Sequence, residues 1–280
     1  MKGFMVTIIA CLSVAAWTTE GFFDSDGVKI HYVTEGEGVP VVLIHGWMSD
    51  MTMWGPKLKP VEGFQLVALD CRGHGQSDKP HDPNQYGAEM AMDIVRLMDH
   101  LKLKKAHLVG YSMGTFIAGK VAASHPERVL SLTYGGQAPL LIGESGSKEI
   151  DTFVKAVDEG KGLGPYIIEV SPPDRKPSLD TANAIAKMLY GNKDVVAWAA
   201  AGRSFKGLEV RLENLRRCAV PILFIYGSKE SDNTKKRVAA LRSSLVASEE
   251  KVIDGGDHVT TLGKPAFGKG LIEFLLAHKG

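Results

Sequence analysis

Five residues, Gly110 to Gly114 with the sequence Gly-Tyr-Ser-Met-Gly, place the strongest constraint on how this chain can fold. The apolar run Ala106 to Val109 precedes them, and a segment of helical character, Thr115 to His125, follows. A serine at a sharp turn from strand to helix adopts a strained backbone conformation, and flanking glycines let the neighbouring elements approach. The Ser112 hydroxyl would then stand at the end of a sheet, next to the first amides of a helix. The pattern predicts a nucleophile, with an ordinary Gly/Ser turn as the alternative.

Short apolar runs recur along the chain and predict the rest of the sheet. They are continuous rather than alternating, which is typical of strands buried on both faces of a parallel sheet. A hairpin with an Asp26-Gly27 turn precedes them, and segments of helical period lie between them. The expected fold is therefore α/β, a mostly parallel central sheet flanked by helices. The runs are Val41 to Ile44, Gln65 to Leu69, Ala106 to Val109, Val129 to Tyr134, Ile222 to Tyr226 and Lys251 to Ile253.

The alternation of strand and helix is interrupted once, over about residues 139 to 207. Two helical stretches are readable there and no convincing strand, so we expect a helical cap inserted between two strands of an α/β domain that covers residues 21 to 280. Large apolar residues of the cap are candidates for the substrate pocket, although packing between helices is an alternative role for each. These candidates are Phe153, Met188, Leu189 and Trp198.

A serine nucleophile needs a base, and nine histidines are available. His258 is favoured by its position, because it follows the last apolar run in the sequence Asp254-Gly255-Gly256-Asp257-His258. In a parallel sheet this loop lies at the same edge as Ser112. We therefore expect His258 to act as the base.

The base in turn needs an acid that orients it, and we expect this acid after the preceding apolar run. The loop from Gly227 to Asn233 offers Glu230 and Asp232. Glutamate is the longer side chain and is favoured, but both residues could instead be helix N-terminal charges. The order nucleophile, acid, base belongs to one fold class among several that use this chemistry.

Charge develops on the substrate oxygen during nucleophilic attack, so donors aimed at that oxygen are required. The backbone amide of Met113, directly after the proposed nucleophile, is one candidate. The amide of Trp47 is the second, because His45-Gly46-Trp47 follows the run Val41 to Ile44 and Gly46 lets the backbone approach closely. An ordinary turn at the end of a strand is the alternative for this loop.

Four motifs occur in a fixed order along the chain: His45-Gly46-Trp47, Asp70-Cys71-Arg72-Gly73-His74-Gly75-Gln76-Ser77, Gly110-Tyr111-Ser112-Met113-Gly114 and Gly256-Asp257-His258. With them, the sequence from about Gly21 onward resembles the α/β-hydrolase superfamily. The resemblance implies a structural role for the second motif, with His74 as a competing base. Two positions depart from the usual family pattern, since Thr115 replaces a common glycine and Glu230 stands where aspartate is more frequent.

The resemblance also excludes some activities. Epoxide hydrolases and haloalkane dehalogenases of this superfamily have an aspartate at the position of Ser112. Proline iminopeptidases usually carry a tryptophan at the position of Met113 and further acids that hold a free amine. The classes that remain are carboxylesterases, lactonases, thioesterases, carbon–carbon bond hydrolases and cofactor-free perhydrolases.

The composition limits which classes of substrate and binding partner are expected. The 280 residues have a formal net charge of +1, with 44% hydrophobic and 23% charged residues and no long run of one sign. This balance favours a small-molecule substrate and argues against a nucleic-acid surface. The three cysteines, Cys11, Cys71 and Cys218, suggest neither a disulfide framework nor a zinc site, and we expect no cofactor and no metal.

The first 20 residues stand apart from the rest. Met1-Lys2 is followed by an apolar stretch and by the small residues Val14-Ala15-Ala16, a pattern typical of an export signal. The stretch is short for a bilayer span, so none is expected in the mature chain. Ile8-Ile9-Ala10-Cys11 resembles a lipoprotein box, which would place a lipid on Cys11. A native N-terminal element, with a cytoplasmic location, is the alternative.

Taken together, these features predict a capped serine hydrolase that cleaves a small carboxylic ester, lactone or thioester through an acyl-enzyme on Ser112. A carbon–carbon bond hydrolase of ring-cleavage products is the alternative within enzymes. The alternative outside enzymes is a non-catalytic member of the fold that binds a small ligand.

Overall fold

The computed structural model describes residues 18–57, 61–171, 173–245 and 247–279, so the predicted export signal and Cys11 lie outside the described residues. Eight strands form one sheet in the order β1-β2-β4-β3-β5-β6-β7-β8. All six predicted runs are strands of this sheet. The strands are β1 (Thr18–Ser25), β2 (Val28–Gly36), β3 (Val39–Ile44), β4 (Phe64–Leu69), β5 (Ala106–Tyr111), β6 (Val129–Gly135), β7 (Ile222–Gly227) and β8 (Ser248–Ile253).

The sheet is parallel from β4 to β8, and the hairpin β1–β2 adds its two strands at one edge. β2 pairs antiparallel with both β1 and β4, and the predicted turn at Asp26 and Gly27 has positive φ angles of 57° and 80°. In the parallel part, Ile44 is level with Gly110 and Gly110 is level with Tyr134. The carboxyl ends of β3, β5 and β6 therefore meet at one edge, where the predicted site residues follow.

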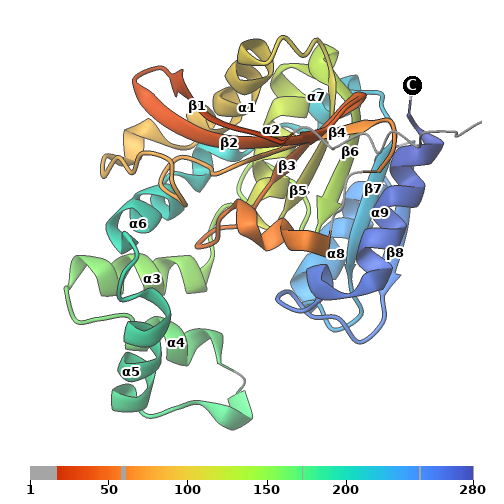
Figure 1. Cartoon of the computed structure of the whole chain (residues 1–280). Helices are drawn as coiled ribbons and strands as arrows, with labels where there is room; N and C mark the ends of the chain where they lie inside the picture. Colours follow the sequence, from red (N-terminus) through yellow and green to blue (C-terminus); the bar gives the residue numbers. More distant parts are fainter. Residues whose placement is uncertain (1–17, 58–60, 172, 246, 280) are drawn as a thin grey trace, which may run out of the picture.

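Helices cover both faces of the sheet, as expected for an α/β fold (Figure 1). Buried side chains of α1 (Ala88–His100), α2 (Met113–Ser124), α7 (Leu212–Arg217) and α8 (Asp232–Arg242) belong to one apolar core. The other face packs against α9 (Pro265–Ala277) and the short 3-10 helix η1 (Met51–Lys57). Among the described parts of the chain, no helix is both long and apolar enough to cross a membrane.

Four helices between β6 and β7 form the predicted insertion: α3 (Lys148–Asp158), α4 (Gly164–Val170), α5 (Leu179–Tyr190) and α6 (Val195–Arg203). Figure 1 shows α3, α4 and α5 as a lobe that projects from the carboxyl edge of the sheet, with α6 nearest to the sheet. Ser147, Ser178 and Asp194 each accept a hydrogen bond from the amide three residues later, which fixes where α3, α5 and α6 begin. The lobe has its own small apolar cluster.

Candidate active site

Ser112 occupies the turn between β5 and α2 in a conformation that residues with a side chain rarely adopt. Its φ is 54° and its ψ is −116°, and its amide donates to the Gly135 carbonyl at 2.8 Å. A Cβ on Gly110 would lie 2.2 Å from the Gly114 carbonyl oxygen, and a Cβ on Gly114 would lie 2.0 Å from the Ile44 carbonyl oxygen. Both glycines are therefore required for α2 to start directly above the sheet.

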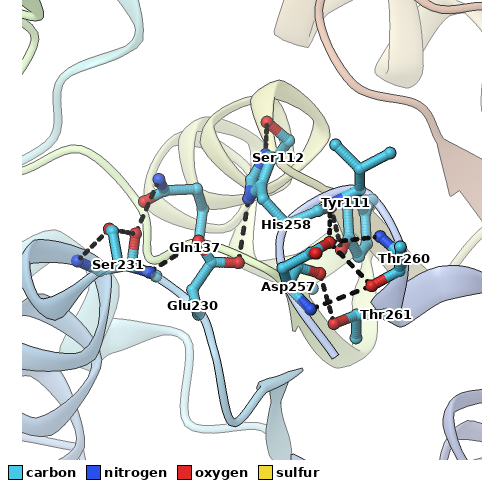
Figure 2. A network of polar contacts seen from close by, with 12 residues as sticks. Tyr111, Ser112, Gln137, Glu230, Ser231, Asp257, His258, Thr260 and Thr261 are labelled. Carbon is cyan, nitrogen blue, oxygen red and sulfur yellow. Dashed lines mark hydrogen bonds and ion pairs between the residues drawn. The ribbon is translucent and has the colours of Figure 1, made fainter. Parts of the chain in front are cut away.

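Three side chains form a chain of hydrogen bonds at this turn (Figure 2). His258 Nε2 lies 2.9 Å from Ser112 Oγ, and His258 Nδ1 lies 3.0 Å from Glu230 Oε2. Because a carboxylate only accepts, Nδ1 carries the proton and Nε2 is the acceptor for the serine hydroxyl. The side chain of Glu230 is 4% exposed and that of His258 is 40% exposed. This arrangement has the geometry of a nucleophile, a base and an orienting acid.

The loop that carries His258 is held by hydrogen bonds of its own. The Asp257 carboxylate accepts from the amide and the hydroxyl of Thr260, at 2.8 and 2.7 Å, and the first of these bonds is the main reason that the pKa of Asp257 is lowered. Thr261 Oγ1 donates to the Asp257 carbonyl at 2.6 Å. The Tyr111 hydroxyl donates to the His258 carbonyl at 2.7 Å, and burial raises the pKa of this tyrosine. His258 is thus fixed from two sides.

The structure separates the two candidate acids. The Glu230 amide donates to the Gly227 carbonyl at 3.0 Å, a tight turn at the end of β7 that directs the carboxylate to His258. Glu230 Oε1 also accepts from the Ser231 amide at 3.1 Å. Asp232 is instead the first residue of α8 and is exposed. Its position matches the alternative expectation of a helix N-terminal charge.

The predicted oxyanion loop runs beside the serine. A Cβ on Gly46 would lie 3.3 Å from Ser112 Cβ, so a larger residue would crowd Ser112. On either side of Trp47, the Gly46 amide donates to Met53 Sδ and the Met48 amide donates to His74 Nε2, both at 3.3 Å. The Trp47 amide therefore lies between two anchored amides.

Two buried histidines support this loop. His45 Nδ1 donates to the Gly46 carbonyl at 2.7 Å and its Nε2 accepts from the Cys71 amide at 2.9 Å. His74 Nδ1 donates to the Arg72 carbonyl at 3.0 Å. Burial lowers the pKa of both rings, that of His74 to about 3, so both are neutral near pH 7. His74 Nε2 accepts the hydrogen bond from the Met48 amide. This contact of His74 is consistent with the structural role implied by the resemblance.

Two cavities meet at Ser112 and His258, and they share Trp47 and Tyr166 as well. The first cavity, of about 800 Å³, lies on the side of Met48, Tyr190 and Val259. The second cavity, of about 420 Å³, lies between the insertion and the ends of β6 and β7. Its described lining includes Phe116, Leu140, Ile150, Phe205, Gln137 and Arg237. A bound molecule can therefore extend from the serine in two directions.

None of the four predicted pocket residues of the insertion lines either cavity, and Phe153 and Trp198 have the alternative role of packing between helices. Phe153 and Trp198 are buried in the apolar cluster behind Trp47, and both contact the oxyanion loop rather than a cavity. The expectation for Met188 and Leu189 is wrong, because they are 77% and 47% exposed and line neither cavity.

Met188 and Leu189 are exposed because a different stripe of α5 is buried. Ala182 and Ala186 face inward, and their small size lets α4 pack closely against α5. The larger side chains of the adjacent stripe are left in solvent. Sequence reasoning missed Phe116, Tyr166 and Phe205 as cavity residues, because only the packing of α2 and the insertion brings them to Ser112.

Arg237 in α8 lines the second cavity, and its donors are largely occupied. The side chain is 14% exposed and its ring neighbour is Phe116, 6.0 Å from the guanidinium carbon to the ring centre. It donates to Gln137 Oε1 at 3.0 Å, to the carbonyls of Ala138 and Pro139 at 3.1 and 2.9 Å, and to Glu144 Oε2 at 3.2 Å.

Among the described residues, no group of three or more His, Cys, Asp or Glu side chains could hold a metal ion.

Known proteins resemble this chain over different parts of its length. A protein of Bacillus subtilis named "Putative 2-succinyl-6-hydroxy-2,4-cyclohexadiene-1-carboxylate synthase" is 34% identical over 274 residues, which cover 90% of this chain and 96% of that protein. The acetyltransferase component of the acetoin cleaving system of Cupriavidus necator is 41% identical over 113 residues, 40% of this chain. That match spans only 30% of the acetyltransferase component.

The fold has close counterparts among solved structures. A carboxylesterase of Nitrososphaera gargenis superposes with a TM-score of 0.75 at 22% identity, covering 92% of this chain and 98% of that one. The family model for the alpha/beta hydrolase fold matches residues 39–147, from β3 through the serine turn to the start of the insertion. Sheet order, the strained serine turn and the relative from Bacillus subtilis agree, and the chain belongs to the alpha/beta hydrolase fold family.

Proposed function

We propose that this protein is a serine hydrolase that cleaves a small carboxylic ester, lactone or thioester through an acyl-enzyme on Ser112. The observation that carries the proposal is the hydrogen-bonded chain from Ser112 Oγ through His258 to Glu230, with distances of 2.9 and 3.0 Å. A serine hydroxyl is a weak nucleophile until a base removes its proton. Here the base already lies at hydrogen-bonding distance.

In the first half of the reaction, His258 Nε2 takes the proton of Ser112 as Oγ attacks the carbonyl carbon. The negative charge that forms on the carbonyl oxygen is stabilised by the backbone amides of Trp47 and Met113. Met113 is the first residue of α2, so its amide has no partner within the helix. His258 then gives its proton to the leaving oxygen or sulfur, and the acyl group stays on Ser112.

In the second half, His258 takes a proton from a water molecule, which attacks the acyl-enzyme. His258 then returns this proton to Ser112 Oγ as the ester bond breaks and the acid leaves. Glu230 keeps the imidazole in the tautomer with Nδ1 protonated and stabilises the imidazolium that forms in both halves. Its burial next to His258 places this negative charge where little solvent screens it.

The pairing of the charged Arg237 side chain in the second cavity supports a substrate whose acyl group is uncharged. The Arg237 guanidinium is paired with Glu144 and donates to three further oxygens, so a substrate carboxylate would have to compete with these partners. A carbon–carbon bond hydrolase of ring-cleavage products is the alternative function. The name of the relative from Bacillus subtilis describes a carboxylate product. Aromatic and aliphatic side chains make up much of the remaining lining of the second cavity.

Two measurements test the proposal. A fluorophosphonate probe should label the wild-type protein and not Ser112→Ala, whereas a protein that only binds ligands has no activated serine to label. Turnover of p-nitrophenyl butyrate should fall by about 10³-fold or more in Ser112→Ala with the fold intact. Absence of labelling in the wild type, or turnover of vinylogous diketones with none of esters, would contradict the proposal.

A further inference from the structure

The side chain of Trp47 lines both cavities at Ser112 and also contacts the helical insertion. Its indole Nε1 donates to the backbone carbonyl of Trp198, in α6, at 2.9 Å. The ring packs edge-on against Phe153, Phe205 and Tyr166, with ring centres 4.9, 5.9 and 6.5 Å away. The residue whose amide is a proposed oxyanion donor is thus joined to the helical insertion through its side chain.

The same face of α6 contacts the indole a second time. A Cβ on Gly202 would lie 3.2 Å from Trp47 Cζ2, so this glycine leaves just enough space for the ring. Trp198 and Gly202 are four residues apart and therefore lie on one side of the helix. The indole is consequently held both by a hydrogen bond and by close packing on α6.

The residue after Trp47 is held against α6 as well. The Met48 amide donates to His74 Nε2 at 3.3 Å, and the His74 ring stacks on that of Trp198, with 6.1 Å between ring centres and 27° between planes. Met48 has a φ of 60°, a left-handed backbone conformation that residues other than glycine and asparagine rarely adopt. Such a conformation persists only where the surroundings hold it.

We propose that Trp47 is a positioning residue, whose indole bond to the Trp198 carbonyl fixes its own backbone amide for the oxyanion, so that α6 sets the geometry of the oxyanion hole. The inference rests on the proposed function. An oxyanion donor acts only when it is aimed at the developing charge before the reaction, and small displacements are costly. The strained Met48 would let the loop relax as soon as the indole bond is lost.

The test is Trp47→Phe, which keeps an aromatic ring and removes the indole N–H. With p-nitrophenyl butyrate, kcat should fall by about 10-fold or more, while KM changes by no more than about 2-fold, because the donor matters in the transition state. The rate of labelling by a fluorophosphonate should fall in parallel. The control is Trp54→Phe, because Trp54 is a buried tryptophan that belongs to the apolar core on the other face of the sheet, and its Nε1 has no partner among the described residues.

A second variant keeps the inference falsifiable if Trp47→Phe does not fold. His74→Phe keeps a ring against Trp198 and removes the acceptor of the Met48 amide, so it should also lower kcat more than it changes KM. Unchanged kcat in the folded Trp47→Phe protein, or a raised KM at unchanged kcat, would overturn the positioning role. The proposed function would survive that result, since it depends on labelling and ester turnover of the wild type and not on how the Trp47 amide is held.

Discussion

The hydroxyl of Tyr111 donates to the backbone carbonyl of His258 at 2.7 Å, so the residue before the proposed nucleophile holds the residue proposed as its base. The bond joins the end of β5 to the loop after β8, which are 147 residues apart in sequence. It fixes the distance between Ser112 and His258 independently of the bond between their side chains.

Tyr111→Phe should therefore lower turnover without changing the chemistry. We expect kcat for a p-nitrophenyl ester to fall by several fold and the free energy of unfolding to fall by about 1 kcal/mol, because the His258 carbonyl loses its donor. Steady-state kinetics and urea unfolding measure the two effects. A loss as large as that of Ser112→Ala would instead give the phenol a direct part in the reaction.

Two inactive variants of Ser112 should differ in stability. The φ of 54° and ψ of −116° are strained for any residue with a Cβ and accessible to glycine. Ser112→Gly should thus unfold at a higher free energy than Ser112→Ala, by about 1 kcal/mol. Both lack the hydroxyl, so chemical denaturation of this pair measures the relief of strain less the extra conformational entropy that glycine loses on folding. Equal stabilities would show that the turn relaxes when the serine is replaced.

Neutralising the two candidate acids should give unequal results. Glu230→Gln removes the charge beside His258 and should lower kcat by about 10²-fold or more, because the imidazolium loses its partner and the tautomer is no longer fixed. Asp232→Asn changes an exposed charge in the first turn of α8 and should leave kcat within about 2-fold. Comparable losses in the two variants would contradict this assignment of the acid.

Acid should destabilise the fold partly through His74. Its pKa in the folded state is about 3, below the usual histidine value of 6.5, because burial disfavours the charged ring. The unfolded chain binds a proton at His74 near pH 6.5, while the folded protein does not. The contribution of the neutral ring to the free energy of unfolding is therefore fully present above that pH and is lost as the pH falls towards 3.

His74→Phe cannot bind this proton, so its free energy of unfolding should fall less between pH 7 and pH 5 than that of the wild type. Urea unfolding at the two pH values gives the comparison. The wild type should retain some acid sensitivity in any case, because burial also lowers the pKa of His107, to about 4. Parallel losses in wild type and variant would show that His74 does not contribute.

The sheet was predictable from the sequence because strands buried on both faces are continuous apolar runs. The serine turn was predictable because glycines flank Ser112 where strand meets helix. Glu230 and Asp232 remained alternatives, since only the turn after β7 decides which carboxylate reaches His258. Met188 was assigned wrongly because a helical period identifies a stripe, and the stripe of alanines packs inward.

The contacts that shape the pocket are between residues far apart in sequence, which no local pattern reveals. Phe116 and Phe205 line the second cavity from α2 and from the end of the insertion. The indole bond of Trp47 joins residues 151 positions apart. His74 was assigned a structural role through the resemblance, but its support of the Met48 amide is visible only in three dimensions.

The contact between Gly114 and the Ile44 carbonyl has a consequence for how this protein can be changed. Since not even a methyl group fits there, the start of α2 offers no room for variation, and libraries aimed at it should yield few folded members. Residues such as Ile150, Tyr166 and Phe205 border empty volume instead. New substrate preferences are therefore best sought by directed evolution of the insertion, while the turn around Ser112 is kept as it is.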